Sequence, residues 1–303
     1  MSVAAVIAGL SGQFQGQVLP QAAMRSFTSW QIGGPAELML IPKNVEDLAL
    51  ALRLCQQSQT PWLAIGKGSN LLVSDKGIAG VVIQIGDAFA QLELLDGYRV
   101  RAGAGLALAL LANTTAKAGY GGLEWAAGIP GSVGGAILMN AGAYGSCIGP
   151  FVTKVELVEY NGSRRTLTGE ELSFAYRQSG IQRETQVVTG VELQLHPGDK
   201  EESVAEIRRL LALRNQNQPL EYPSAGSVFK NPAGDHAGRL SEAAGCRGMQ
   251  VGGAQVSLKH GNFIVNLGGA TAQDVKTLIG MVQEKVKTQF GIDLEPEVRM
   301  VGE

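Results

Sequence analysis

The stretch that most constrains this chain runs from residue 123 to residue 145 and reads LEWAAGIPGSVGGAILMNAGAYG. It contains six glycines. Glycine lets the backbone approach another backbone or a ligand closely and reaches positive φ, at a cost in conformational entropy. A glycine-rich turn between core segments is one interpretation. A loop whose backbone N–H groups cradle a phosphate is the other, and it explains why so many glycines are needed.

A second stretch, IGKGSN at residues 65–70, favours phosphate binding. It follows the apolar run 62–65 and precedes the apolar run 71–73, as a turn between two strands would. It matches neither the dinucleotide fingerprint GxGxxG nor a P-loop ending in GK[ST]. Two separate phosphate-cradling loops suit the diphosphate of a dinucleotide better than a mononucleotide.

Five strings carry a resemblance to one family. They are IGKGSNLLVSDKG, GIPGSVGGAILMNAGAYG, PSAGSVFKNP, GGAQVSLKHGNFIVN and LEPEVRMVG, in this order. Together they resemble the UDP-N-acetylenolpyruvoylglucosamine reductases, over residues 28–302. The glycine-rich pair alone would indicate only the wider vanillyl-alcohol-oxidase type of FAD-binding fold.

The resemblance implies an α+β protein with a two-lobed FAD-binding domain of the vanillyl-alcohol-oxidase type and a C-terminal α+β substrate-binding domain. We expect the first lobe at residues 1–80, the second at 81–198 and the substrate-binding domain at 199–303. The implied cofactors are FAD and NADPH. In the reaction that the resemblance implies, NADPH reduces the flavin, and the reduced flavin transfers hydride to the enolpyruvyl ether of a UDP-sugar, which yields UDP-N-acetylmuramate for peptidoglycan synthesis.

The two glycine loops are the expected FAD-binding site. The residues concerned are Gly66, Lys67, Gly68, Ser69 and Asn70 in the first loop, and Gly128, Ile129, Pro130, Gly131, Ser132, Gly134, Gly135 and Asn140 in the second.

The resemblance assigns catalysis to Arg177, Ser227 and Glu297. Ser227 matches the serine that donates the proton, and a serine is so weak an acid that it can protonate only a strongly basic carbanion-like centre. Arg177 matches the arginine that polarises the enolpyruvyl carboxylate, which suits its planar fork of donors. Glu297 should be protonated and donate a hydrogen bond to the enolate, because a second carboxylate there would repel the first.

The substrate diphosphate needs cations. Arg214 and Arg299 are the expected cations, and Asn231 matches a further family residue for substrate binding. The segment between Arg177 and the strand that follows it is short, with no inserted loop carrying a substrate-clamping tyrosine. The chain therefore resembles the shorter subtype of the family.

The composition excludes several other classes. The 25 basic and 27 acidic residues give a net charge of −2, so no basic footprint for nucleic acid exists. Three cysteines without a CxxC motif and three scattered histidines predict neither a disulfide framework nor a metal site. No apolar run approaches the length of a membrane helix. We expect a cytoplasmic protein that binds no metal, nucleic acid or membrane, and expect a monomer, although no motif addresses the oligomeric state.

Local patterns predict the main helices and strands. Asn44 should cap a helix whose first turn carries two acidic residues, and Asp96-Gly97 signals a hairpin. Thr271 and Asp274 form a capping-box pattern for a helix that ends at Gly291. Further expected elements are a short helix before residue 24, helices at 106–118, 201–218 and 272–290, and strands at 38–41, 62–65, 151–160, 186–195 and 294–301.

Two other functions remain open from the residues. An FAD-dependent oxidase of the same fold would need a different C-terminal domain, and often a histidine or cysteine for covalent flavin attachment. The three histidines lie outside the glycine loops. A non-catalytic flavin- or UDP-sugar-binding protein would have no reason to retain Arg177, Ser227 and Glu297 together.

Overall fold

The computed structural model describes residues 3–302 and groups them into two compact units. The first unit holds residues 3–20, 37–67 and 80–212, and the second holds 21–36, 68–79 and 213–302. The chain passes from the first unit to the second within helix α5 (Lys200–Asn217). The division into 1–80, 81–198 and 199–303 expected from the sequence remains a prediction.

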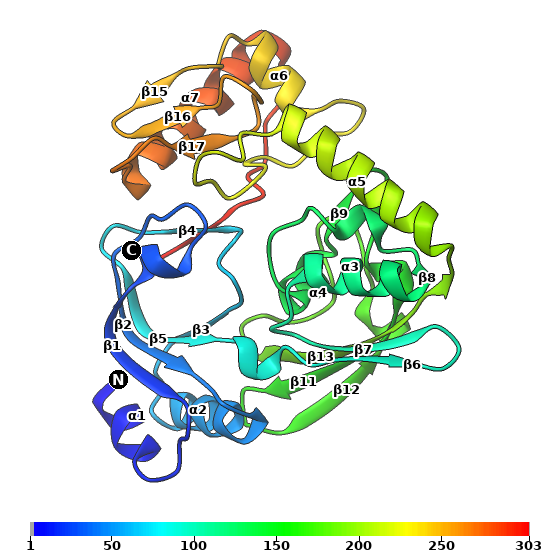
Figure 1. The fold of residues 1–303 in the computed structure, drawn as a ribbon. Coiled ribbons are helices and arrows are strands. Elements are labelled where there is room, and N and C mark those ends of the chain that lie inside the picture. Colours follow the sequence, from blue (N-terminus) through cyan, green and yellow to red (C-terminus); the bar gives the residue numbers. More distant parts are fainter. Residues whose placement is uncertain (1–2, 303) are drawn as a thin grey trace. The chain divides into compact units, whose positions relative to one another are not determined.

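A four-stranded sheet and two helices form the N-terminal part of the fold. The sheet has the order β1 (Gln17–Ala23), β2 (Pro35–Ile41), β5 (Ile78–Gln84) and β3 (Trp62–Ile65), with β3 parallel to β5. Helix α2 (Val45–Gln57) follows β2, and the Asn44 side chain accepts the Asp47 N–H at 2.8 Å as predicted. Helix α1 (Val3–Leu10) packs on α2, beside the sheet (Figure 1).

The rest of the first unit is built on a five-stranded antiparallel sheet. Its order is β12 (Arg164–Thr168), β11 (Val152–Glu159), β13 (Gln186–Gln194), β7 (Arg99–Gly103) and β6 (Leu92–Leu95). Helices α3 (Leu108–Ala118) and α4 (Val133–Met139) lie over one face of this sheet (Figure 1), and α4 packs on β13 and β7. The sheet therefore supports α4, which begins in the glycine-rich stretch.

A row of alternating charges crosses four strands of this sheet. Lys154, Glu192, Arg101 and Glu93 stand opposite one another in the register of β11, β13, β7 and β6. The Glu192 carboxylate lies 3.9 Å from Lys154, 3.8 Å from Arg101 and 3.5 Å from Arg99. Opposite charges on facing strands stabilise one register against its alternatives.

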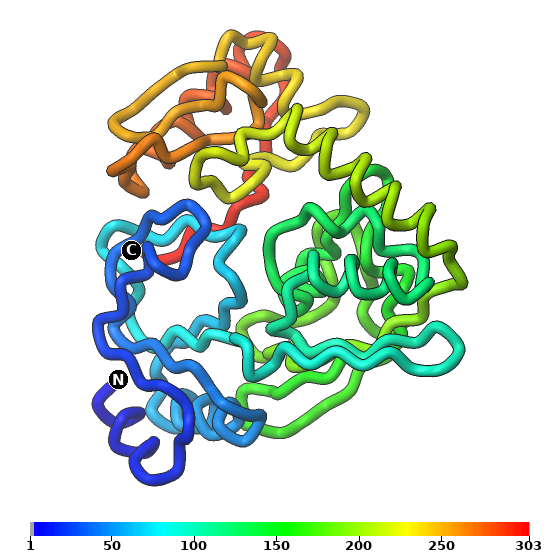
Figure 2. The backbone as a smooth tube through the Cα atoms, in the orientation of Figure 1, coloured from blue at the N-terminus to red at the C-terminus, as the bar shows by residue number. Residues whose placement is uncertain are grey.

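The second unit combines a three-stranded sheet with two helices and a parallel strand pair. The sheet has the order β15 (Gln250–Val251), β16 (Ala254–Val256) and β17 (Ile264–Asn266), against which α7 (Ala272–Phe290) packs, and α6 (Ala237–Ala243) packs on α7. Strand β18 (Arg299–Val301) pairs in parallel with β4 (Leu71–Val73). Figure 2 shows the red C-terminal segment running to the cyan segment that carries β4. The apolar core of this unit includes Trp30 and Leu72 beside C-terminal residues.

Short elements complete the chain. They are the strand pairs β8 (Tyr120–Gly121) with β14 (His196–Pro197) and β9 (Gly142–Ala143) with β10 (Ser146–Cys147), and 3-10 turns at Met24–Phe27, Asp87–Phe89, Glu124–Ala126, Gly149–Phe151 and Glu170–Leu172.

Most local predictions are confirmed, and the α+β class is confirmed with them. The capping box of α7 is present in full, and Gly291 ends the helix at φ +69°. The last strand is an exception, because only residues 299–301 pair as a strand, whereas 294–301 was predicted. Residues 295 and 297 instead form hydrogen bonds with the segment 228–230.

We predict that Glu192→Gln lowers the free energy of unfolding by about 1 kcal/mol, since several ion pairs lose their shared anion. Urea denaturation in low salt measures the change, and high salt should reduce it. Glu206→Gln, which removes one exposed helical pair with Arg209, is the matched control and should change stability by a few tenths of that amount. Equal losses in the two variants would refute a network at Glu192.

Candidate active site

The two predicted glycine loops meet in the first unit. A Cβ added to Gly66 would lie 2.2 Å from the Ser132 Oγ, so a side chain at residue 66 would force Ser132 to shift. Two loops with so few side chains at their contact fit a diphosphate, which binds through N–H groups rather than long side chains. This observation agrees with FAD as the group that the two loops hold.

The second loop is rigid because its backbone is hydrogen-bonded to the segment before α3. The Val133 N–H donates to Leu106 O at 2.8 Å, and the Gly134 N–H donates to Ala104 O at 2.8 Å. Gly131 adopts φ +132°, a conformation that other residues avoid. Ser132 then caps α4, with its Oγ accepting the Gly135 N–H at 3.4 Å.

Gly128, Ile129 and Pro130 lead into this capped turn and are half-buried or exposed. The Ile129 N–H donates to Ala126 O at 3.0 Å, which continues the 3-10 turn before the loop. Their contacts with FAD remain predictions.

The end of IGKGSN lies in the second unit, whereas Gly66 and the exposed Lys67 lie in the first. Gly68 has φ +63°, and a Cβ there would lie 1.9 Å from Phe27 O. Ser69 is half-buried. The Asn70 Nδ2 donates to Glu297 O at 3.1 Å, and Asn70 O accepts the Arg299 N–H at 3.0 Å. Asn70 therefore connects the predicted cofactor loop with a predicted catalytic residue.

Asn140 ends α4 in the left-handed conformation and is buried. Its Nδ2 donates to Ala175 O at 2.9 Å, and its Oδ1 accepts the Gly149 N–H at 2.9 Å. Its side chain thus holds the segment that precedes Arg177, while its predicted contact with FAD remains untested.

Arg177 stands at the tip of a tight turn in the first unit. Ala175 and Gln178 exchange two backbone hydrogen bonds of 3.0 and 3.1 Å, and Arg177 takes φ +56°. Its guanidinium lies 5.1 Å from the ring centroid of Tyr176. Side chains of Ser179 and Arg183 donate to Leu138 O at 3.0 and 3.1 Å, so this turn is attached to the end of α4.

Ser227 and Glu297 are brought together in the second unit. The Glu297 N–H donates to Val228 O at 2.7 Å, and Phe229 forms an antiparallel bridge with Pro296. Gly226, at φ +75°, turns the chain immediately before Ser227. Both Ser227 and Glu297 are half-buried. Two of the three predicted catalytic residues are therefore on adjacent segments, while Arg177 belongs to the other unit.

The predicted substrate residues also lie in the second unit. Arg299 opens β18, and Arg214 lies in the last turn of α5; both side chains are half-buried. Asn231 is exposed, and its Oδ1 accepts the Ala237 N–H at 3.1 Å, at the start of α6. Their roles in substrate binding remain predictions.

Asn262 is a residue at this site that the sequence did not indicate. It is 4% exposed, and its side-chain amide forms two hydrogen bonds with the backbone of Phe229. Its own N–H donates to His260 Nδ1 at 3.1 Å. The string HGNFIVN contains Asn262, but no local pattern distinguishes a buried bracing asparagine from a turn residue.

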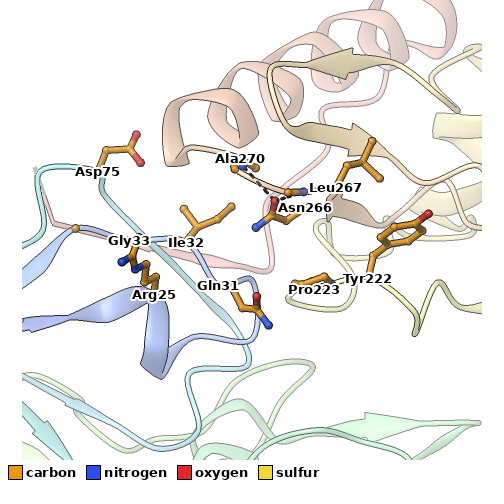
Figure 3. Close-up of a pocket in the computed structure, with 13 residues that line it drawn as sticks. Arg25, Gln31, Ile32, Gly33, Asp75, Tyr222, Pro223, Asn266, Leu267 and Ala270 are labelled. Carbon is orange, nitrogen blue, oxygen red and sulfur yellow. Dashed lines mark hydrogen bonds between the residues drawn. The ribbon is translucent and has the colours of Figure 1, made fainter.

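A cavity of about 530 Å³ lies elsewhere in the second unit (Figure 3). Arg25, Gln31, Tyr222 and Asn266 contribute side chains to its lining. Asn266 already bonds with its own neighbours, and Asp75 accepts two N–H groups at the start of α7. The cavity is lined by none of Ser227, Glu297 and Arg299, so we do not assign the reaction to it.

Among residues 3–302, no group of three or more histidine, cysteine, aspartate or glutamate residues is arranged to hold a metal ion. Within the same range, no helix has both the length and the apolar character needed to span a bilayer.

The fold and the family model of the first unit place the chain among FAD-binding proteins. Residues 36–168 match the family model described as FAD binding domain. The arrangement of helices and sheets also resembles that of the berberine bridge enzyme H104A variant, with a TM-score of 0.50 and 13% identity. The match covers 66% of this chain and 44% of that chain, and it is a likeness of fold alone. The predicted vanillyl-alcohol-oxidase type of FAD-binding domain is thereby confirmed.

Residues 218–301 match the family model described as UDP-N-acetylenolpyruvoylglucosamine reductase, C-terminal domain. The chain is 49% identical to the UDP-N-acetylenolpyruvoylglucosamine reductase of Heliobacterium modesticaldum, over 97% of this chain and 94% of that protein. It resembles the crystal structure of the Thermus caldophilus enzyme with TM-score 0.82 and 36% identity, over 95% and 100% of the two chains. The chain belongs to the UDP-N-acetylenolpyruvoylglucosamine reductase family, so it is an FAD-dependent oxidoreductase.

We predict that Gly66→Val weakens FAD binding, because its side chain would push the Ser132 loop away. Overpacking costs about 1–3 kcal/mol, or roughly 5- to 150-fold in affinity. The flavin absorbance of purified protein measures the effect, and acid precipitation should release the flavin. Gly280→Ala is the control, since a Cβ there meets nothing within 4 Å. Normal flavin content in Gly66→Val would refute the assignment of the loops.

A further prediction concerns pH. Burial, followed by the nearby Arg247, lowers the pKa of His260 below its usual 6.5, against a smaller opposing effect of Glu242. The unfolded state therefore binds a proton at higher pH than the folded state, and stability falls as pH decreases from about 6.5 toward the lowered pKa. Protonation also removes the Nδ1 acceptor of the Asn262 N–H.

Urea denaturation at about pH 7.5 and pH 5.5 tests this effect. The wild type should lose more stability over this interval than His260→Gln, which does not titrate. Identical losses in the two proteins would show that His260 does not contribute.

Proposed function

We propose that this enzyme reduces the enolpyruvyl ether of UDP-N-acetylglucosamine enolpyruvate to UDP-N-acetylmuramate, with NADPH as the electron source. The observation that carries the proposal is the pairing of the Ser227 and Glu297 segments through the 2.7 Å bond between Glu297 N–H and Val228 O. The names of the relatives reported above identify them as reductases of this substrate.

The glycine loops around Gly66 and Gly131 would hold FAD, and bound FAD supplies hydride chemistry once NADPH has reduced it. The chain's own residues must then stabilise the negative charge that develops on the substrate. Arg177 would bind the enolpyruvyl carboxylate, because a planar fork of donors matches two carboxylate oxygens.

Glu297, in its protonated form, would donate a hydrogen bond to the enolate oxygen. Fixed donors are effective at such a centre because they need no reorganisation during the reaction. Ser227 would then deliver its proton to the carbon next to the one that receives hydride, which completes the addition of H⁻ and H⁺ across the double bond. The proximity of the two segments supports this division of roles.

Arg214 and Arg299 would neutralise the UDP diphosphate, and Asn231 would add a polar contact to the substrate. Arg299 follows Glu297 by two residues, so one segment would carry both a catalytic group and a diphosphate ligand. We also propose that the protein acts as a monomer in the cytoplasm. All three cysteines are free thiols, which suits a reducing compartment.

We predict that Ser227→Ala separates the two halves of the reaction. Reduction of the flavin by NADPH needs no proton at the substrate carbon, so its rate should remain near normal. Reoxidation by the enolpyruvyl substrate should slow about 10²- to 10⁴-fold, the usual contribution of a general acid. Rapid-mixing absorbance of the flavin measures each half.

Ser227→Cys is the matched variant and should recover part of the lost rate, because a thiol still donates a proton. Arg177→Ala and Glu297→Ala should fail in the same half as Ser227→Ala. If Ser227→Ala slowed both halves equally, the serine would be placing the flavin, and the proposed role would fail. Persistent flavin reduction without any substrate turnover in the wild type would instead favour a binding protein.

A further inference from the structure

The strongest unexplained feature near the proposed site is a buried asparagine that forms hydrogen bonds with main chain instead of facing a ligand. Asn262 Oδ1 accepts the Phe229 N–H at 2.9 Å, and its Nδ2 donates to Phe229 O at 2.8 Å. Its backbone O accepts the Val228 N–H at 2.8 Å. One residue thus satisfies three backbone groups in the two residues that follow Ser227.

The other side of the same segment is hydrogen-bonded to residues 295–297. Val228 O accepts the Glu297 N–H at 2.7 Å, and the Lys230 N–H donates to Glu295 O at 2.9 Å. The segment 228–230 therefore lies between Asn262 on one side and residues 295–297 on the other, and it is hydrogen-bonded to both. A shift of this segment would move Ser227 relative to Glu297.

The amide of Asn262 can act here only in one orientation. Its oxygen must face the Phe229 N–H and its nitrogen must face Phe229 O. The side-chain amide then binds both backbone groups of one residue, as a residue on a neighbouring strand does. The Asn262 N–H is in turn bound to His260 Nδ1 at 3.1 Å, and the side chain is 4% exposed. Solvent therefore cannot replace the bonds that a substitution removes.

We infer that Asn262 is a positioning residue, which holds the proton-donor segment of Ser227 in register with Glu297. The inference rests on the proposed function, in which Ser227 donates the proton and Glu297 stabilises the enolate. A displacement of about 1 Å at a reacting group can cost roughly 100-fold in rate, so a residue outside contact with substrate can control the protonation step.

Two variants test the inference. Asn262→Ala removes both side-chain bonds to Phe229. Asn262→Asp keeps an acceptor for the Phe229 N–H but places a second oxygen against Phe229 O. This variant replaces Asn262→Ala in the test if the alanine variant does not fold. We expect flavin content and the rate of flavin reduction by NADPH to stay within about twofold of wild type, and reoxidation by the enolpyruvyl substrate to slow by about 10- to 100-fold.

The second unit offers a matched control. Asn266 is also buried, at 6% exposed, and its side chain also bonds with backbone: Oδ1 accepts the Gly268 and Ala270 N–H groups, and Nδ2 donates to Trp30 O at 3.0 Å. The segments that it holds carry no proposed catalytic residue. Asn266→Ala should lower the midpoint of thermal unfolding about as much as Asn262→Ala does. Its flavin should nevertheless be reoxidised by the enolpyruvyl substrate at the normal rate.

Calorimetric titration with UDP-N-acetylglucosamine adds a measurement that does not depend on turnover. Its affinity should stay within about threefold of wild type in Asn262→Ala, since the inferred defect is in register rather than in the diphosphate site. The inference would be overturned if folded Asn262 variants reoxidised their flavin at the normal rate, or if Asn266→Ala slowed flavin reoxidation as much as they do. It would also be overturned if the Asn262 variants slowed both half-reactions equally, or if both of them failed to bind FAD. If Ser227→Ala itself reoxidized normally, the proposed function would fail instead.

Discussion

The parallel pairing of β18 with β4 is the interaction on which the second unit depends. It joins residues 299–301 to residues 71–73, across more than two hundred residues of chain. Because Asn70 directly precedes β4, the same pairing places its amide against Glu297 O. Glu297 in turn donates its N–H to Val228 O, in the segment after Ser227. One short strand pair thus connects the end of a predicted cofactor loop to two proposed catalytic residues.

Helix α4 has a comparable role in the first unit. Its beginning is the glycine turn, where small residues let the Ser132 loop reach Gly66. Its end is bound to the Arg177 turn through Asn140, Ser179 and Arg183. Two glycines in a seven-residue helix weaken it intrinsically, at about 1 kcal/mol each relative to alanine. The external hydrogen bonds at both ends compensate for that weakness and connect the cofactor loop with the proposed carboxylate-binding arginine.

Patterns that depend on neighbouring residues were predicted well from the sequence. The Asn44 cap, the hairpin at Asp96-Gly97 and the capping box of α7 are each set by side chains within one turn. Helix α4 was not predicted, because a glycine-rich run argues against a helix unless tertiary contacts support it. The β4–β18 pair was not predicted either, since three residues in each strand carry too little pattern to identify a distant partner.

The same limit applies to the site. Gly66, Ser132, Ser227 and Glu297 were identified through a resemblance of whole strings, and the structure then brought Gly66 to Ser132 and Ser227 to Glu297. Asn262 was not identified, because its role depends on Phe229, which lies 33 residues earlier in the chain. A contact of that span leaves no periodic signal in sequence.

The supports around Ser227 fit the chemistry proposed for it. A serine hydroxyl is a poor acid, so its use as a proton donor depends on placing it against a basic carbon rather than on changing its acidity. Five hydrogen bonds hold the main chain of residues 228–230, from Asn262 on one side and residues 295–297 on the other. Gly226, which precedes Ser227, has nothing within 4 Å in its Cβ direction. The main chain on the other side of Ser227 is held beside Glu297 by these hydrogen bonds, as the proposed proton transfer would require.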